Sequence, residues 1–162
     1  KEISNWYADL VKKTLTLDKI TKSTFDQIFP NGIANLSQET IAETAKQFLN
    51  VPYLWSGRSF FGIDCSGFVQ LVYKTHGISL PREAQQQSEI GDVLSFVEES
   101  KPGDLAFFEN EEGLISHVGM MLNTQEIIHA YGKVRIDEVD STGIFNKELN
   151  KHTHKLRFLR SI

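Results

Sequence analysis

Hydrophobic positions follow two different spacings along the chain. Up to about residue 91 they recur three and four positions apart, whereas from about residue 102 they alternate with polar residues or form short runs. The first spacing is typical of amphipathic helices and the second of strands. Helices followed by an antiparallel sheet predict an α+β fold in which the helices pack on the sheet.

The helical part contains two predicted helices. The first begins near Ser37, whose side chain suits an N-cap, and ends at residues 50–52, Asn-Val-Pro. The second extends from Cys65 to about Thr75, and Gly77 suits the position just after its end. The apolar stripes that we expect in the core are Ile41, Ala42, Ala45, Phe48 and Leu49 in the first helix, and Phe68, Val69, Leu71, Val72 and Tyr73 in the second.

A short helical turn and a set of strands complete the predicted elements. The turn begins at Pro81 and stops at Gly91, and its Arg82 and Gln87 are expected to tie it to the sheet or to a loop. Pro-Gly at 102–103 marks the entry into the first strand. The strands are predicted over residues 104–108, 115–122, 126–131, 134–139 and 155–159.

The pattern also divides the chain into two parts. Residues 1–36 mix apolar positions with Ser and Thr and contain a strong turn signal, Pro-Asn-Gly at 30–32. We expect them to be an N-terminal extension or the tail of a preceding domain. Residues 37–162 are expected to form one domain, which suits a chain of 162 residues.

Charge and cysteine content exclude several kinds of partner and site. The net charge is −4, which argues against a nucleic acid or an anionic membrane as partner, because both are bound through basic surfaces. No apolar run approaches the roughly 18 residues of a membrane-spanning helix. A single cysteine excludes an internal disulfide, and no metal or organic cofactor is expected.

The single cysteine, Cys65, lies in the run 62–67, Gly-Ile-Asp-Cys-Ser-Gly, at the start of the second helix. Asp64 suits the N-cap, so Cys65 falls in the first turn, where free N–H groups and the helix dipole favour negative charge. We therefore expect a lowered thiol pKa, and a backbone N–H available to an oxyanion. A free cysteine is more often a small core residue. The polar start of a helix is an unusual place for one, which favours a nucleophile.

Two histidines, His117 and His129, lie 12 positions apart on strands joined by a predicted hairpin. With a left-handed Asn123 at the centre of the turn, the two side chains face each other about 5 Å apart. A two-residue turn at 123–124 would put them on opposite faces. Each histidine alone is more simply interpreted as a hydrogen-bonded strand residue. Together with Cys65 they predict a thiol nucleophile, a general base and a residue that orients the base.

The other three histidines give weaker signals. His76 lies at a helix end, where a cation is favourable. His152 and His154 are spaced like two metal ligands on a strand, but two ligands without a third are weak support for a metal site. Solvated or dipole-complementing roles are expected for all three.

Several runs in this order carry a resemblance to a known family. They are residues 53–58 (Tyr-Leu-Trp-Ser-Gly-Arg), 64–69 (Asp-Cys-Ser-Gly-Phe-Val), 80–82 (Leu-Pro-Arg), 102–108 (Pro-Gly-Asp-Leu-Ala-Phe-Phe), 117–119 (His-Val-Gly) and 128–130 (Ile-His-Ala). The chain resembles the NlpC/P60 family of papain-like cysteine peptidases from about Ser37 to Leu159. The resemblance implies a papain-like catalytic domain over 37–162, with the nucleophile at a helix N-terminus.

The resemblance also implies an activity. Enzymes of this kind hydrolyse the bond between γ-linked D-glutamate and a diamino acid, meso-diaminopimelate or lysine, in bacterial cell-wall peptides. By this resemblance Cys65 is the nucleophile, His117 the general base and His129 the residue that orients the base. The acyl-enzyme is then a thioester on Cys65.

The sequence of residues 55–67 is most similar to that of a subgroup whose members carry SH3-like domains ahead of the catalytic domain. There, residues matching Asp64 and Ser66 bind the free amine of an N-terminal L-alanine, and a tyrosine matching Tyr53 assists the oxyanion site. Residues 1–36 are too short for an SH3-like domain, so such a domain before Lys1 is an expected partner. Ser56 departs from the family, which usually has the first of two glycines there.

Two other functions stay open on the sequence. A catalytically silent wall-binding module would keep the fold but would leave Cys65 inert to alkylation at neutral pH. A thiol acyltransferase or transglutaminase-like enzyme would use the same thioester chemistry, although such sites usually have an acidic third residue where this chain has His129. For location, the periplasm or the exterior is favoured, and recycling of wall fragments in the cytoplasm is the alternative.

Overall fold

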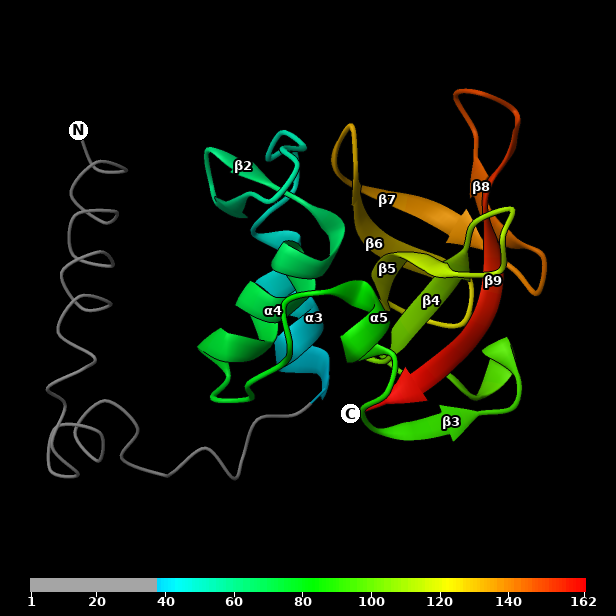
Figure 1. Ribbon diagram of the computed structural model, residues 1–162, viewed down its shortest axis with the longest axis horizontal. Coiled ribbons are helices and arrows are strands. Elements are labelled where there is room, and N and C mark those ends of the chain that lie inside the picture. The colour runs from blue at the N-terminus through cyan, green and yellow to red at the C-terminus, as the bar shows by residue number, and fades with distance from the viewer. Residues whose placement is uncertain (1–37) are drawn as a thin grey trace, which may run out of the picture. The chain divides into compact units, whose positions relative to one another are not determined.

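The computed structural model describes residues 38–162, so the predictions for residues 1–36 and for Ser37 lie outside the described residues. Within the described part, helices cover one side of a set of antiparallel strands (Figure 1). The expected α+β class is confirmed. The helices of residues 38–162 are α3 (Gln38–Lys46), α4 (Cys65–Thr75) and the short α5 (Ala84–Gln87), and a 3-10 turn, η3, covers Val97–Glu99.

The strands form a closed barrel with a small hairpin outside it. The hairpin consists of β1 (Arg58–Ser59) and β2 (Gly62–Ile63). The large sheet has the order β3-β9-β4-β5-β6-β7-β8, and β8 also pairs with β9, which closes six of its strands into a ring. Their bounds are β3 Asp92–Leu94, β4 Leu105–Glu109, β5 Ile115–Met121, β6 Glu126–Tyr131, β7 Lys133–Val139, β8 Gly143–Asn146 and β9 Lys151–Ser161.

Four predicted strands are confirmed within a residue or two, but barrel closure was not predicted. The sequence pattern did not indicate β3 or β8, and it placed the last strand only over 155–159. The observed β9 is longer because it pairs with β8 at its start, with β4 along its middle and with β3 at its end. These pairings join residues far apart in sequence.

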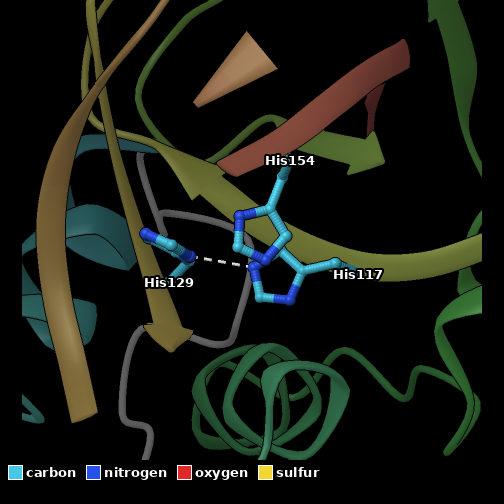
Figure 2. Close-up of side chains that lie close together, drawn as sticks. All are labelled: His117, His129 and His154. Carbon is cyan, nitrogen blue, oxygen red and sulfur yellow. Dashed lines mark hydrogen bonds between the residues drawn. The ribbon is translucent and has the colours of Figure 1, made fainter. Parts of the chain in front are cut away.

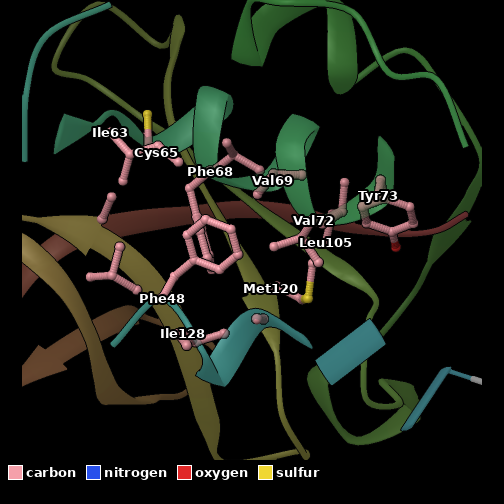
Figure 3. Packing of buried hydrophobic residues seen from close by; sticks show 14 of the residues in the cluster. Phe48, Ile63, Cys65, Phe68, Val69, Val72, Tyr73, Leu105, Met120 and Ile128 are labelled. Atoms are coloured by element: carbon pink, nitrogen blue, oxygen red, sulfur yellow. The ribbon is translucent and has the colours of Figure 1, made fainter. Parts of the chain in front are cut away.

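Two hydrophobic clusters lie on the two faces of the barrel strands. Leu105 and Phe107 of β4 belong to the cluster beneath the helices, together with Phe68 of α4, whereas Ala106 and Phe108 point into the barrel. This alternation follows from strand geometry. Figure 3 shows the helix-side cluster, in which Phe68 is completely buried. Truncating such a phenylalanine to alanine costs about 3–5 kcal/mol, so this cluster fixes α4 on the sheet.

The ends of α4 are set by the residues that the sequence predicted. Asp64 is the N-cap, and its carboxylate accepts the backbone N–H of Gly67 at 2.7 Å. Gly77 follows the helix with φ +77°, which favours glycine. The prediction for His76 was wrong. Its side chain is buried and hydrogen-bonded to Thr44 at 2.8 Å, and burial lowers its pKa, so it is not a cation at the helix end.

Two further positions refine the sequence predictions. Leu49 does not join the apolar face of α3, because it lies after the helix and is 38% exposed. Ser56, the position usually glycine in the family, has φ +60°, in the left-handed region that favours glycine. Among residues 38–162, no helix has the length and apolar character needed to cross a bilayer.

Candidate active site

Cys65 is the first residue of α4 and lies at the edge of the helix-side cluster. It is only 9% exposed, and Figure 3 shows its sulfur turned away from the rings of Phe48 and Phe68. The backbone of Val118 is hydrogen-bonded to the thiol, and this hydrogen bond lowers the thiol pKa. Because Val118 directly follows His117 in β5, the thiol lies beside the strand that carries the expected base.

The expected lowering of the Cys65 pKa was wrong for the free protein. Burial raises the pKa of this thiol, and the neighbouring Asp64 carboxylate raises it further, while backbone hydrogen bonds from Val118 and Ser66 act in the opposite direction. The start of a helix favours a thiolate, but removing the sulfur from water outweighs that effect. A raised pKa favours the neutral thiol, which becomes a nucleophile only when a base removes its proton.

The β5–β6 hairpin puts His117 and His129 on the same face, as the odd-length turn requires. Gly119 pairs with His129, so His117 is the diagonal neighbour of His129 and not its direct opposite. A Cβ at Gly119 would lie 2.6 Å from Ile127 Cδ1 and 2.9 Å from the Cβ of His129, so the close packing beside His129 requires glycine here.

The turn between these strands differs from the prediction in its detail. The loop consists of three residues, 123–125, closed by a hydrogen bond from the Leu122 N–H to the Glu126 carbonyl at 2.9 Å. Asn123 is not in the left-handed region. Its side-chain oxygen instead accepts the backbone N–H groups of Gln125 and Glu126 at 2.8 and 2.9 Å. The side chain of Asn123, and not its backbone, therefore shapes the turn.

A hydrogen-bonded chain runs from His117 to a buried carboxylate. Nε2 of His117 lies 2.8 Å from Nδ1 of His129 (Figure 2), and Nε2 of His129 lies 3.0 Å from Asp137. A carboxylate only accepts, so His129 donates its Nε2 proton to Asp137 and accepts the Nε2 proton of His117. His117 then carries a lone pair on Nδ1. In Figure 2 this nitrogen points away from His129, on the side where α4 is seen.

Asp137 and its partner Arg135 were missed at the sequence level. Arg135 Nε lies 2.7 Å from one Asp137 oxygen and its Nη2 donates to the other at 2.9 Å. Burial alone would raise the pKa of Asp137, but hydrogen bonds from His129 and Arg135 hold it below its ordinary value. The sequence does contain a pattern that could have indicated both residues. A turn centred on Gly132 places Arg135 opposite His129, and Asp137 on the same face of β7.

His154, expected to be solvated, instead packs against His117. Its ring stacks on that of His117 with centroids 4.1 Å apart and planes at 29° (Figure 2), and it meets the Tyr131 ring edge-on at 4.8 Å. Phe108 lies near both rings, with its centroid 5.8 Å from that of His117 and 6.0 Å from that of His154. The prediction failed because His154 reaches the site only through barrel closure. His152 does match its expected exposed role and pairs with Asp140 at 3.0 Å.

The burial of these rings keeps them neutral. Burial lowers the pKa of His117 well below 6.5, and the neighbouring His129 and His154 lower it further. Burial also lowers the pKa of His129, although Asp137 acts in the opposite direction. For His154, burial is the main cause of a pKa of about 4. A neutral His117 at neutral pH can accept a proton from a thiol.

The other predicted site residues gather around the start of α4. Arg82 forms an ion pair with Asp64 and donates to Ser66 Oγ at 2.8 Å, while Gln87 donates to the Ser66 carbonyl at 3.0 Å. Arg82 and Gln87 thus tie the segment around α5 to the residues on either side of Cys65. The charges of Cys65 and Asp64 also act on Tyr53, whose pKa is raised mainly by burial.

Known proteins share sequence with this chain. The sequence profile of the NlpC/P60 family matches residues 50–154. A γ-D-glutamyl-L-lysine dipeptidyl-peptidase of Bacillus cereus is 39% identical over 102 residues, or 62% of this chain and 30% of that protein. The protein of the same name from Bacillus subtilis is 43% identical over 94 residues, or 57% of this chain and 31% of that protein.

The fold of the chain also matches a crystal structure. An NlpC/P60 family protein from Bacillus cereus aligns with a TM-score of 0.66 at 31% identity, covering 78% of this chain and 40% of that one. The chain spans less than a third of the length of the two curated relatives. Because the profile match takes in more than half of the chain, including α4 and all three clustered histidines, the chain belongs to the NlpC/P60 family.

Proposed function

We propose that this chain is a cysteine peptidase that hydrolyses the bond between γ-linked D-glutamate and a diamino acid in bacterial cell-wall peptides. The observation that carries the proposal is the hydrogen-bonded chain from His117 through His129 to Asp137, beside the only cysteine. The names of the two Bacillus relatives, γ-D-glutamyl-L-lysine dipeptidyl-peptidases, support the choice of bond.

The first half of the reaction makes a thioester. Nδ1 of His117 takes the thiol proton as the sulfur of Cys65 attacks the γ-carbonyl carbon of D-glutamate. The Cys65 N–H and the Tyr53 hydroxyl donate to the oxyanion. The imidazolium of His117 then passes its proton to the leaving nitrogen. The diamino acid departs with a free amine, and the glutamyl group stays on the sulfur.

The second half returns the enzyme to its starting state. Neutral His117 takes a proton from water, whose oxygen attacks the thioester carbon. Collapse of this intermediate releases the glutamate carboxylate and the Cys65 thiolate, which recovers its proton from His117. His129 and Asp137 stabilise the imidazolium in both halves, since each hydrogen bond in the chain strengthens when His117 is charged. No metal or organic cofactor takes part in these steps.

Asp64 and Ser66 are proposed to bind the free amine of an N-terminal L-alanine. Both are already bound by Arg82, whose guanidinium neutralises the Asp64 carboxylate. A substrate ammonium therefore has to share this carboxylate with Arg82. The requirement for a free amine is thus a separate proposal from the hydrolysis itself, and it needs its own substrate comparison.

The wider setting is also part of the proposal. We propose that the protein acts outside the cytoplasm on the wall, with recycled wall fragments in the cytoplasm as the alternative substrate. An SH3-like domain that precedes residues 1–36 is the proposed partner for the substrate site.

The test is mass spectrometry of peptide products. L-Ala-γ-D-Glu-L-Lys and the corresponding diaminopimelate peptide, each with a free and an acetylated N-terminus, are incubated with the chain, with Cys65→Ala and with His152→Ala as a matched control. We expect cleavage between D-glutamate and the diamino acid by the chain and by His152→Ala only. Equal cleavage by Cys65→Ala would overturn the mechanism. Cleavage of both free and acetylated peptides would overturn only the amine requirement.

A further inference from the structure

Three histidines on three different strands bring ring nitrogens together at the candidate active site. His117 comes from β5, His129 from β6 and His154 from β9, and one nitrogen from each lies within 4.8 Å of the other two (Figure 2). Among residues 38–162 this is the group whose ligand atoms could hold a metal ion. The proposed hydrolysis uses His117 and His129 but gives His154 no role.

The surroundings of the cluster match those of metal-binding histidines. A histidine that binds a metal usually donates its other N–H to a carboxylate, which fixes the ring and its tautomer. His129 has this arrangement, because its Nε2 faces Asp137 at 3.0 Å while its Nδ1 faces the cluster. Asp137 is itself fixed by Arg135. In His154, Nδ1 lies 2.9 Å from the Thr153 hydroxyl, which leaves Nε2 available.

The spacing of the nitrogens is close to that of a zinc site. With Zn–N bonds of about 2.1 Å, the nitrogens of a tetrahedral site lie roughly 3.4 Å apart. Here the His117–His129 pair is at 2.8 Å, and no pair in the cluster exceeds 4.8 Å. The pair must open slightly, and His154 must rotate from its stacked position so that its lone pair points at the ion. Of the three rings His154 is the most exposed, so it is the one with room to move.

We propose that these three histidines form an inhibitory site for a divalent transition-metal ion, Zn²⁺ in the first place. Neutral imidazoles suit Zn²⁺, and three of them leave a fourth position for water. On binding, the Nε2 proton of His117 moves to Nδ1, so no proton is released from the ring. Nδ1 then donates and can no longer take the Cys65 proton. The ion therefore blocks the base without touching the nucleophile.

Binding is tested without relying on turnover. The chain is treated with a chelator and desalted, then titrated with Zn²⁺ by calorimetry and with Co²⁺ by visible spectroscopy. We expect one ion per chain and the absorption bands of four-coordinate cobalt. The Cys65→Ala variant should bind equally well, so loss of the proposed hydrolysis cannot be confused with loss of the metal site. If the chelator-treated chain binds no Zn²⁺ ion, the proposal is overturned.

Variants of β9 assign the site. His154→Phe keeps a ring beside His117 but removes the nitrogens, and His154→Gln is a second variant in case the first does not fold. Either should weaken Zn²⁺ binding at least about 100-fold, and Asp137→Asn should weaken it about 10- to 100-fold. His152→Phe, on the same strand but outside the cluster, should bind like the parent. Equal binding by His154→Phe and His152→Phe would place the ion elsewhere and overturn the assignment.

The inhibitory step rests on the proposed function and has its own readout. Zn²⁺ should inhibit peptide cleavage by the parent chain with the constant measured for binding, and a chelator should restore activity. His154→Phe should resist the same Zn²⁺ concentrations. If the parent binds Zn²⁺ through His154 yet cleaves peptide at its full rate, the site stands and its inhibitory role is overturned.

Discussion

The two halves of the candidate active site are held in place by different forces. On the helix side, Cys65 is fixed by hydrophobic packing around Phe68 and by the Asp64 cap with its Arg82 ion pair. On the barrel side, His117 is fixed by a chain of hydrogen bonds that ends at a buried carboxylate. The helix side therefore fixes the position of Cys65, whereas the barrel side fixes both the position and the protonation state of His117.

This difference teaches where each kind of substitution should act. Packing is non-directional, so the helix side can lose the thiol itself and keep its geometry. A hydrogen-bonded chain is directional, so one altered member changes the tautomer of every ring before it. Substitutions on the helix side should mostly change stability or remove the nucleophile outright. Substitutions on the barrel side should change the rate and its pH dependence.

The largest expected effect is loss of the nucleophile or the base. Cys65→Ala should lower kcat by on the order of 10⁵, and His117→Ala by nearly as much, because the two act as a unit. Cys65→Ala should lower the free energy of unfolding by only about 1 kcal/mol. Peptide cleavage and urea unfolding measure both quantities. Residual turnover above about one per cent of the parent rate in either variant would contradict the roles proposed for Cys65 and His117.

The pH profile of the parent chain sharpens this result. His117 must be neutral to accept the thiol proton, and burial lowers its pKa below 6.5. The acid limb of kcat/KM should therefore lie below pH 6.5. Alkylation of Cys65 should accelerate as the pH rises into the alkaline range, because burial raises the thiol pKa. Rapid alkylation with no pH dependence between 6 and 9 would instead indicate a preformed thiolate.

The next largest effect is expected at the end of the hydrogen-bonded chain. Asp137→Asn should lower kcat by about 10²–10³, since an amide no longer forces His129 to donate through Nε2. It should also move the acid limb of the pH profile. The matched control is Asp140→Asn, which alters the exposed pair with His152 and should leave kcat unchanged. If Asp137 had only a structural role, the Asp137→Asn variant would have a lower melting temperature and an unaltered pH profile.

On the helix side the corresponding test is stability. Arg82→Ala leaves the buried Asp64 carboxylate without its cation and should lower the free energy of unfolding by about 3 kcal/mol. Arg157→Ala is the control, because the Arg157 side chain is 57% exposed and Glu109 keeps a second partner in Lys155, so the loss of stability should be much smaller. Chemical denaturation compares the two. Equal losses would mean that the cap, and not the ion pair, holds the start of α4.

Local pattern was enough to predict much of the site. The N-cap at Asp64 and the helix from Cys65 depend on residues within a few positions of one another, and the shared face of His117 and His129 depends on a single hairpin 12 positions long. The same holds for β4 to β7, whose alternation the sequence displays. Asp137 could also have been predicted, because the turn at Gly132 determines which face of the sheet carries its side chain.

What could not be predicted depends on contacts between distant segments. Barrel closure through β8 and β9 brings His154 to His117, and no local pattern indicates which strands meet. The raised pKa of Cys65 has the same origin, because burial comes from the assembled core and outweighs the local effect of the helix start. Local chemistry was therefore predicted better than its environment.

A smaller effect is expected from pH on stability. In the unfolded chain His154 takes up a proton as the pH falls through about 6.5, whereas in the fold its pKa is about 4. Between these values the unfolded state binds more protons, so acid destabilises the fold, by on the order of 2 kcal/mol for this residue. His154→Phe should flatten the dependence measured by urea unfolding between pH 7 and 4.5. His152→Phe should leave the slope unchanged.

The smallest effect tests the loop that leads to the nucleophile. Ser56 is exposed and has φ +60°, so its Cβ is strained in the left-handed region, at a cost of roughly 1 kcal/mol. Ser56→Gly removes this strain but adds backbone freedom to the unfolded chain, so the net gain in stability should be about 0.5 kcal/mol. Ser56→Ala keeps the Cβ, removes the hydroxyl and should give no gain. If the alanine variant gains as much as the glycine variant, the strain at this position is negligible. A gain confined to glycine would show that the helix side, although held by packing, still carries local backbone strain ahead of its nucleophile.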